Sequence, residues 1–107
     1  MEKDLLMEFK NNLLITWEDE QTDLKCKNSL NNAKGQMNSL IGSEIDFEKD
    51  LFARSLLLNC ARYHYNNVSE FFEDNFQKEI LRLQLLEASG GYNEKTHNWW
   101  NQKEYRP

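Results

Sequence analysis

Apolar residues recur along this chain at helical spacing, and the clearest case lies between residues 24 and 41. Positions three or four residues apart share one face of an α-helix. The apolar residues with this spacing are Cys26, Leu30, Ala33, Met37, Leu40 and Ile41. Gly42 is well suited to end the helix as a left-handed residue, and Gly35 inside it indicates a close helix crossing. The pattern predicts a one-faced helix of about five turns.

Residues 47–88 contain the densest apolar pattern and predict two more helices. The first runs from about residue 47 to about residue 65, and its part 51–65 is apolar on most sides, as is typical of a helix that packs against several neighbours. Its polar residues are Ser55, Asn59 and Arg62, which form one narrow stripe, and Arg54 and His64, which lie outside it. Asp46 is expected to cap this helix, and the pair Asn66 and Asn67 is expected to break it.

A further helix is predicted over residues 68–88, up to the helix-stopping run Ser89-Gly90-Gly91. Its main apolar face consists of Phe72, Phe76, Ile80 and Leu83. Beyond Ile80 the pattern changes, because leucines occupy more than one side of the helix. These leucines are Leu81, Leu83, Leu85 and Leu86. Apolar residues on two sides predict a second packing partner for the distal half of this helix.

The amino-terminal part predicts a short helix followed by an extended connector. The helix spans residues 4–12, and its apolar residues are Leu5, Leu6 and Phe9. Residues 14–17 are rich in β-branched and aromatic side chains, which favour an extended segment. Trp17 is expected to fill the core. Either Thr16 or Asp19 is then placed to cap the next helix.

Together these elements predict an all-α fold, a small bundle of three to four helices formed by residues 1–89, with an irregular carboxy-terminal tail at 90–107. The tail is polar, but it contains Tyr92, Trp99, Trp100 and Tyr105. Tryptophan is enriched among the residues that dominate binding interfaces, so the tail is predicted to be an arm that docks on a partner. The alternative is that these rings fold back and are buried on their own domain.

Composition is that of an ordinary water-soluble domain. The chain has 107 residues, of which 39% are apolar and 29% are charged, and both fractions are usual for globular proteins. No apolar run approaches the ~20 residues that span a bilayer. The first residues lack the basic and then apolar layout of a secretory signal. We therefore expect a cytoplasmic protein that makes no membrane contact.

Charge is negative and unevenly distributed. The net charge is −5, and residues 1–23 carry seven acids against two bases. This balance argues against a groove that grips nucleic acid through many phosphate contacts. The acidic end indicates either a protein with distinct faces for different neighbours or simply a solvated surface.

Candidate catalytic and metal-binding groups do not converge in the sequence. Cys60 and His64 are four residues apart on one helix, but zinc takes four protein ligands, or three and a water, and Cys26 and His97 have no matching motif spacing. Both cysteines are expected to be buried free thiols. Neighbouring acids on a helix point apart, and no phosphate-binding loop or nucleophile motif is present. We expect no enzymatic activity, no metal and no cofactor.

Arg54 and Arg62 are two cations on the otherwise apolar helix at residues 51–65. A guanidinium group can bind a carboxylate through two hydrogen bonds, which suits it to buried or interfacial ion pairs. The candidate partners within the domain are Glu70, Glu73 and Glu79. Pairing across a subunit boundary is the alternative.

Several stretches of the chain together resemble a known protein family. The most specific part is the run Arg62-Tyr63-x-x-Asn66-Asn67 followed by Phe71-x-Glu73-x-x-Phe76. The other parts are Ile15-Thr16-Trp17-Glu18-Asp19-Glu20-Gln21-Thr22-Asp23, the run Glu44-Ile45-Asp46-Phe47, and Ile80-Leu81-Arg82-Leu83-Gln84-Leu85. These stretches lie within residues 15–86 and are similar to the small head-tail connector proteins, also called adaptor or head-completion proteins, of long-tailed bacteriophages and of prophages of Gram-positive bacteria.

The resemblance implies a structural protein with no catalytic activity. In that family, all-helical subunits form a closed ring of about twelve copies below the portal protein. The ring extends the DNA channel and receives the stopper or tail-completion protein. The resemblance therefore implies assembly in the host cytoplasm and a final place at the virion head-tail junction. An acidic channel lining would repel phosphates and let DNA slide past without sequence-specific binding.

Candidate contact residues follow from combining the two lines of reasoning. Arg54, Arg62, Leu81 and Leu85 are the candidates for the subunit interface. Trp99 and Trp100, with Tyr92 and Tyr105, are the candidates for contact with the portal protein. A second hypothesis does not depend on a phage origin. In it, the chain is a small helical adaptor or regulator that binds a protein partner through its aromatic tail.

Overall fold

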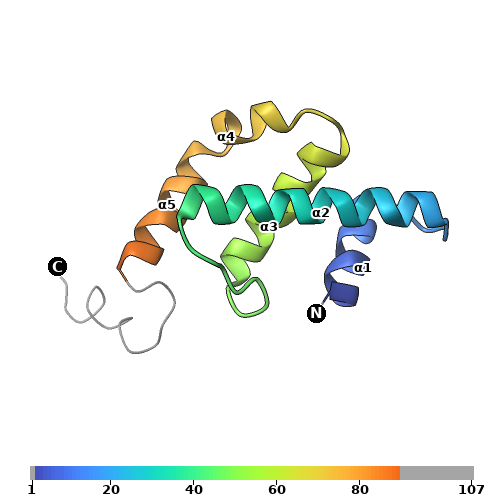
Figure 1. Cartoon of the computed structure of the whole chain (residues 1–107), viewed down its shortest axis with the longest axis horizontal. Helices are drawn as coiled ribbons and strands as arrows, with labels where there is room; N and C mark the ends of the chain where they lie inside the picture. The colour runs from blue at the N-terminus through green and yellow to red at the C-terminus, as the bar shows by residue number, and fades with distance from the viewer. Residues whose placement is uncertain (1, 90–107) are drawn as a thin grey trace.

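The computed structural model describes residues 2–89, and within them every regular element is a helix (Figure 1). The elements in chain order are α1 (Glu2–Asn12), α2 (Glu20–Ile41), α3 (Leu51–Tyr65), the 3₁₀ helix η1 (Ser69–Phe71), α4 (Phe72–Asn75) and α5 (Gln77–Ala88). The predicted all-α fold is thus confirmed. None of the helices in this part of the chain is long and apolar enough to cross a membrane.

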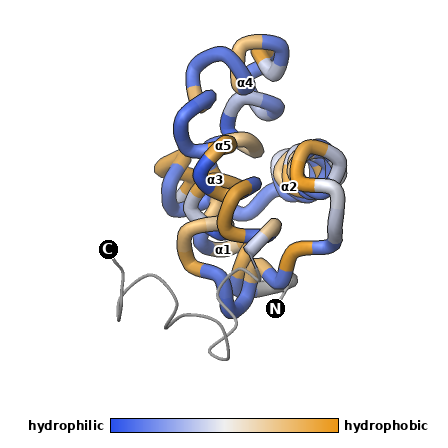
Figure 2. The backbone as a smooth tube through the Cα atoms, turned by 90° about the vertical axis from the view of Figure 1, so that its left-hand side faces the viewer, coloured by the Kyte–Doolittle hydropathy of each residue, from blue (hydrophilic) through white to orange (hydrophobic). Residues whose placement is uncertain are grey.

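The long helix α2 forms one side of the bundle, and α1, α3 and α5 pack along it (Figures 1 and 2). Lys10 of α1 contacts Asp23 near the amino-terminal end of α2. Gln84 of α5 donates from Nε2 to the Leu40 carbonyl at the other end, at 2.9 Å. α1 and α5 are therefore held at opposite ends of α2. The core between the helices consists mainly of leucine, alanine and phenylalanine side chains, including the fully buried Phe9 and Phe72.

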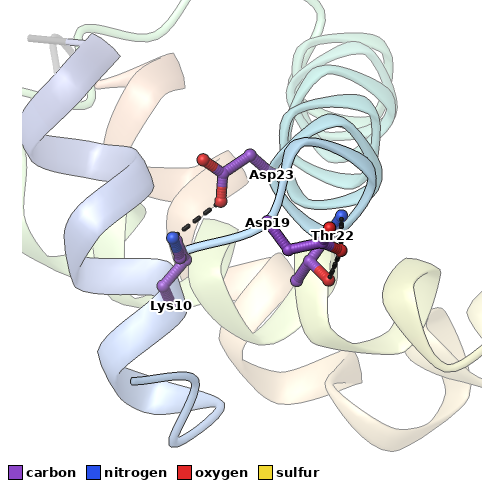
Figure 3. Close-up of polar contacts among 4 residues, drawn as sticks. All are labelled: Lys10, Asp19, Thr22 and Asp23. Carbon is purple, nitrogen blue, oxygen red and sulfur yellow. Dashed lines mark hydrogen bonds and ion pairs between the residues drawn. The ribbon is translucent and has the colours of Figure 1, made fainter. Parts of the chain in front are cut away.

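Helix α2 follows its predicted face closely. Cys26, Leu30, Ala33 and Met37 are buried, while Leu40 and Ile41 are partly buried against the same core. The start is capped by Asp19, whose side chain accepts from the backbone N–H of Thr22 at 3.1 Å (Figure 3). Gly35 does not mark a close crossing, because a Cβ atom added there meets nothing within 4 Å. It faces solvent, so that prediction was wrong.

Helices α1, α2 and α3 each end at a residue in the left-handed region. These residues are Leu14 (φ 62°), Gly42 (φ 87°) and Asn67 (φ 61°). After α1 the Ile15 N–H donates to the Lys10 carbonyl at 2.9 Å, and the Leu14 N–H donates to Asn11 at 3.0 Å. This is the Schellman arrangement, which satisfies carbonyl groups at a helix end. The ends at Gly42 and Asn67 match the sequence analysis, whereas an extended residue 14 had been expected.

The turn at Leu14 decides which connector residue enters the core. It directs Ile15 into the core, where its side chain is buried. Trp17 remains 54% exposed. The prediction that Trp17 fills the core was wrong, because the smaller Ile15 takes that position two residues earlier.

Helix α3 ends at the predicted residue, Tyr65, but it begins at Leu51, four residues later than predicted, and has a different cap. The Asp50 carboxylate accepts from the Ala53 N–H at 3.0 Å, and this contact begins the helix. Asp46 instead accepts from the backbone of Glu48 and Lys49 in the preceding turn. The prediction of Asp46 as the cap was wrong, since this extra turn moves the capping position four residues along the chain.

The segment after α3 is broken into three pieces, where one continuous helix over 68–88 had been predicted. Phe76 lies between α4 and α5 with non-helical angles, φ −120° and ψ 29°. Its ring stacks on Phe72 at 5.0 Å between centroids, and Tyr63 meets both rings edge-on. We attribute the break to this aromatic cluster, because such contacts outweigh helix propensity, which is a weak preference. The apolar face itself is confirmed, since Phe72, Ile80 and Leu83 are buried.

Candidate functional site

An exposed apolar strip on α5 is the most distinctive surface of the molecule. Leu81 is 55% exposed and Leu85 is 62% exposed. They line an open hollow of about 710 Å³ together with Lys78 and Arg82. The four residues are spaced by three, one and three positions, so they share one side of the helix. We call Lys78, Leu81, Arg82 and Leu85 the α5 face.

The two cations of the α5 face, Lys78 and Arg82, lie beside its two leucines. The Arg82 guanidinium lies 5.0 Å from the centroid of the Phe52 ring, a cation–π contact that holds it against the bundle. Within residues 2–89, neither Lys78 nor Arg82 makes an ion pair. Leu83, on the other side of α5, is fully buried. The exposed side of α5 is thus an apolar strip with two cations that make no ion pair within the described residues, and the second partner predicted for this helix stays a prediction.

Arg54 pairs inside the domain, but with an acid that the sequence analysis did not consider. Its Nε and one terminal nitrogen contact the same oxygen of Glu8, at 2.8 Å and 2.7 Å. This joins α3 to α1 across 46 sequence positions. The predicted partners Glu70, Glu73 and Glu79 were wrong, since Arg54 faces α1 and those acids follow α3 on other elements.

Arg62 also has partners other than the predicted acids. Its Nη2 donates to the Asn59 amide oxygen at 3.0 Å, and its guanidinium lies 5.3 Å from the centroid of the Tyr63 ring. Ser55, Asn59 and Arg62 line a groove of about 580 Å³ between α1 and α3, with Arg54 and Glu8. The predicted polar stripe is therefore a groove wall. Its assignment to a subunit interface stays a prediction.

A second exposed apolar surface lies at the α1 end and was missed in the sequence analysis. Met7 and Trp17 flank a hollow of about 670 Å³, and Glu18 lies on its rim. We call Met7, Trp17 and Glu18 the α1 face. The available signals were Met7, which lies off the stripe of buried apolar residues on α1, and a tryptophan followed directly by three acids.

An ion pair fixes the position of the α1 face. Lys10 Nζ lies 2.6 Å from Asp23 Oδ1, so the last turns of α1 are tied to the first turns of α2 (Figure 3). The hydrogen bond with Asp23 raises the pKa of Lys10, against a smaller opposing effect of desolvation. Both residues line the hollow of the α1 face. Its geometry is therefore set by contacts between two helices.

Gln36 connects Cys60 and His64, the two candidate metal ligands that lie four residues apart on α3. Its amide oxygen accepts from His64 Nε2 at 2.7 Å and from Cys60 Sγ at 3.4 Å, while its amide nitrogen donates to Glu73 at 3.2 Å. Burial raises the pKa of the Cys60 thiol to about 12. Within residues 2–89, no three side chains of metal-binding type gather at one point. As predicted, Cys26 and Cys60 are buried free thiols.

His64 makes folding stability dependent on pH. Desolvation lowers its pKa from the ordinary 6.5, so the unfolded chain binds a proton at a higher pH than the folded chain does. Stability is therefore lost as the pH falls below about 6.5, through the window down to the lowered pKa. We expect His64→Gln, in urea unfolding at about pH 7 and about pH 5, to lose less stability on acidification than the parent chain. Equal losses in both proteins would contradict this assignment.

The tail residues Tyr92, Trp99, Trp100 and Tyr105 lie outside the described residues, so their predicted role as a docking arm stays a prediction. The chain matches no family model, no curated protein and no solved structure.

Proposed function

We propose that this chain is a structural subunit of a phage or prophage head-tail connector, and that its copies form a ring below the portal protein. The ring extends the DNA channel and offers an attachment surface to the stopper or tail-completion protein. It assembles in the host cytoplasm and ends at the head-tail junction of the virion. The observation that carries the proposal is the exposed α5 face, an apolar strip on the outer side of a helix at one end of the bundle.

An exposed strip of this kind suits an assembly protein. Two large leucines on one side of a helix expose apolar surface to water, and contiguous exposed apolar patches mark interaction sites. Leu81 and Leu85 each keep more than half of their side chain in solvent, although Ile80 and Leu83 of the same helix are buried. The two leucines of the strip therefore do not contribute to the packing of the subunit's own core.

The residues that carry the family resemblance support the same proposal through their position. Tyr63 follows Arg62 in the first motif, and Phe76 closes the second. Their rings meet edge-on at 5.6 Å, and Asn75 donates to the Tyr63 hydroxyl at 2.9 Å. Together they form the elbow between α3 and α5. The motif thus corresponds to the part of the fold that sets the direction of α5 relative to α3.

Charge favours a channel through which DNA passes freely. The chain carries a net charge of −5, and a ring of many copies multiplies that charge. A surface of the same sign as the phosphate backbone does not retain DNA. The proposed contact with DNA is therefore loose and independent of sequence.

The proposal is tested by mixing the purified chain with the portal protein of the phage or prophage to which the proposal assigns it. Size-exclusion chromatography with light scattering should show a ring-sized species or a portal-bound complex of many copies. A monomer in isolation is compatible with the proposal, because assembly on the portal alone is sufficient. A chain that stays monomeric in the presence of portal protein would overturn it.

A further inference from the structure

We infer that the α5 face of one copy docks on the α1 face of the next copy. The inference rests on the proposed function, since it names the contact that would join subunits in the ring. It concerns two surfaces that are both apolar, both exposed and both formed within residues 2–89. One presents two leucines beside two cations, and the other presents Met7 and Trp17 beside a carboxylate.

The positions of the two faces prevent them from meeting within one copy. The α1 face is fixed at Asp23 of α2, and α5 is fixed at Leu40. Seventeen residues of helix separate these points, which corresponds to about 26 Å at 1.5 Å per residue. A contact between the faces is therefore a contact between copies. Because the faces differ, it is head-to-tail, the type of contact that closes into rings.

Charge selects the second copy over other occupants of the α5 face. Lys78 and Arg82 lack ion-pair partners within the described residues. The hollow of the α1 face is lined by two carboxylates, Glu18 and Asp23, and by one cation, Lys10, which pairs with Asp23. Complementary potentials favour this pairing, whereas two α5 faces would bring like charges together.

The carboxy-terminal tail is a poorer match for the α5 face. Residues 90–107 contain three cations against two carboxylates, so they bring no net negative charge to Lys78 and Arg82. The tail does contain two tryptophans, and covering of the α5 face by the tail is therefore an outcome that the test must distinguish.

The two faces are also similar in size and lining. Leu81 and Leu85 line an open hollow of about 710 Å³, and Met7 and Trp17 line one of about 670 Å³, to which the buried Ile15 also contributes. Trp17 stands at the rim of this hollow, half exposed. Tryptophan beside a hollow that accepts apolar side chains is the usual composition of an interface hot spot.

The test uses cysteines at the rims of the faces, so that the apolar and charged residues of both remain. Thr16→Cys lies at the rim of the α1 face and Ala88→Cys at the end of the α5 hollow. The native thiols do not compete, since both are buried and burial raises the pKa of each. Mixed and oxidised at high protein concentration, the two variants should form the 16–88 disulfide on the order of tenfold faster than either forms a disulfide with itself. Asn32→Cys, on an exposed part of α2, provides the background rate with each variant.

Exchanging the charges of Arg82 and Glu18 tests whether these two residues pair across the contact. Arg82→Glu in the Ala88→Cys chain should reduce the 16–88 product to the background rate, and Glu18→Lys in the Thr16→Cys chain should restore it. A dominant 88–88 product would show that two α5 faces meet, and would overturn the inference. A 16–88 product that appears only after removal of residues 90–107 would assign the α5 face to the tail, and would also overturn it.

The outcomes separate this contact from the function on which it rests. If the chain assembles on portal protein but the 16–88 product forms no faster than background, the docking contact is wrong and the proposed function stands. If the 16–88 product is strongly preferred but portal protein is ignored, the contact stands and the proposed function is wrong.

Discussion

Replacing Phe72 with alanine is expected to lower the free energy of unfolding by about 3–5 kcal/mol. The ring is fully buried, stacks on Phe76 and meets Tyr63 edge-on. Its removal leaves a cavity at the elbow between α3 and α5, and the surrounding helices can close it only in part. For a domain of this size such a loss is a large share of the total stability. Urea unfolding followed by circular dichroism measures it.

The adjacent Phe71 provides a matched control. It is the same residue type one position earlier, but its side chain is 52% exposed. Phe71→Ala should change stability by no more than about 0.5–1 kcal/mol. Similar losses for the two variants would show that the aromatic cluster does not hold the elbow in the way described.

The double substitution Leu81→Asp with Leu85→Asp is expected to abolish assembly while the fold is kept. Both side chains are largely in solvent, so the melting temperature and helicity should stay close to those of the parent chain. Two carboxylates in the middle of an apolar contact would have to be desolvated without partners, at a cost of several kcal/mol. Light scattering of the variant with portal protein should therefore show free monomer.

Leu24→Asp is the control for this experiment. Leu24 is an exposed leucine on α2, 58% accessible, and it lines a different hollow. Its substitution should leave assembly intact. Loss of assembly with Leu24→Asp alone, or normal assembly of the Leu81 and Leu85 variant, would contradict the role given to the α5 face.

Sequence patterns were most informative where local and tertiary preferences agree. The apolar face of α2, its end at Gly42 and the end of α3 at Tyr65 were all predicted correctly. In each case the helical spacing of apolar residues and the terminating residue point to the same structure. Gly42 illustrates this, since glycine adopts a φ of 87° without strain.

The failures occur where contacts between distant residues decide the outcome. Phe76 interrupts a segment whose spacing is helical throughout, as its ring packs with Phe72 and Tyr63 across the elbow. Leu14 adopts a left-handed conformation that leucine rarely prefers, and this moves Ile15 rather than Trp17 into the core. No local signal in the sequence marks either event.

The candidate site could be predicted only in part from the sequence, because contacts between distant residues form much of it. The change of pattern after Ile80 correctly indicated leucines on the exposed side of α5. The sequence could not identify Glu8 as the partner of Arg54. Glu8 precedes Arg54 by 46 positions, and spacing rules apply only within one helix. The α1 face was also missed, since its two apolar residues come from α1 and from a connector whose path could not be foreseen.

The left-handed residues at the ends of α1, α2 and α3 have a consequence for the speed of folding. At each of these helix ends the backbone hydrogen bonds join residues at most five positions apart, as between Ile15 and Lys10. Domains dominated by such local contacts fold in microseconds to milliseconds. The proposed ring requires many copies at one time, and rapid folding suits this requirement, because slowly folding chains expose their interiors to one another and aggregate. The helix ends thus limit the time in which nascent copies can associate through the wrong surfaces.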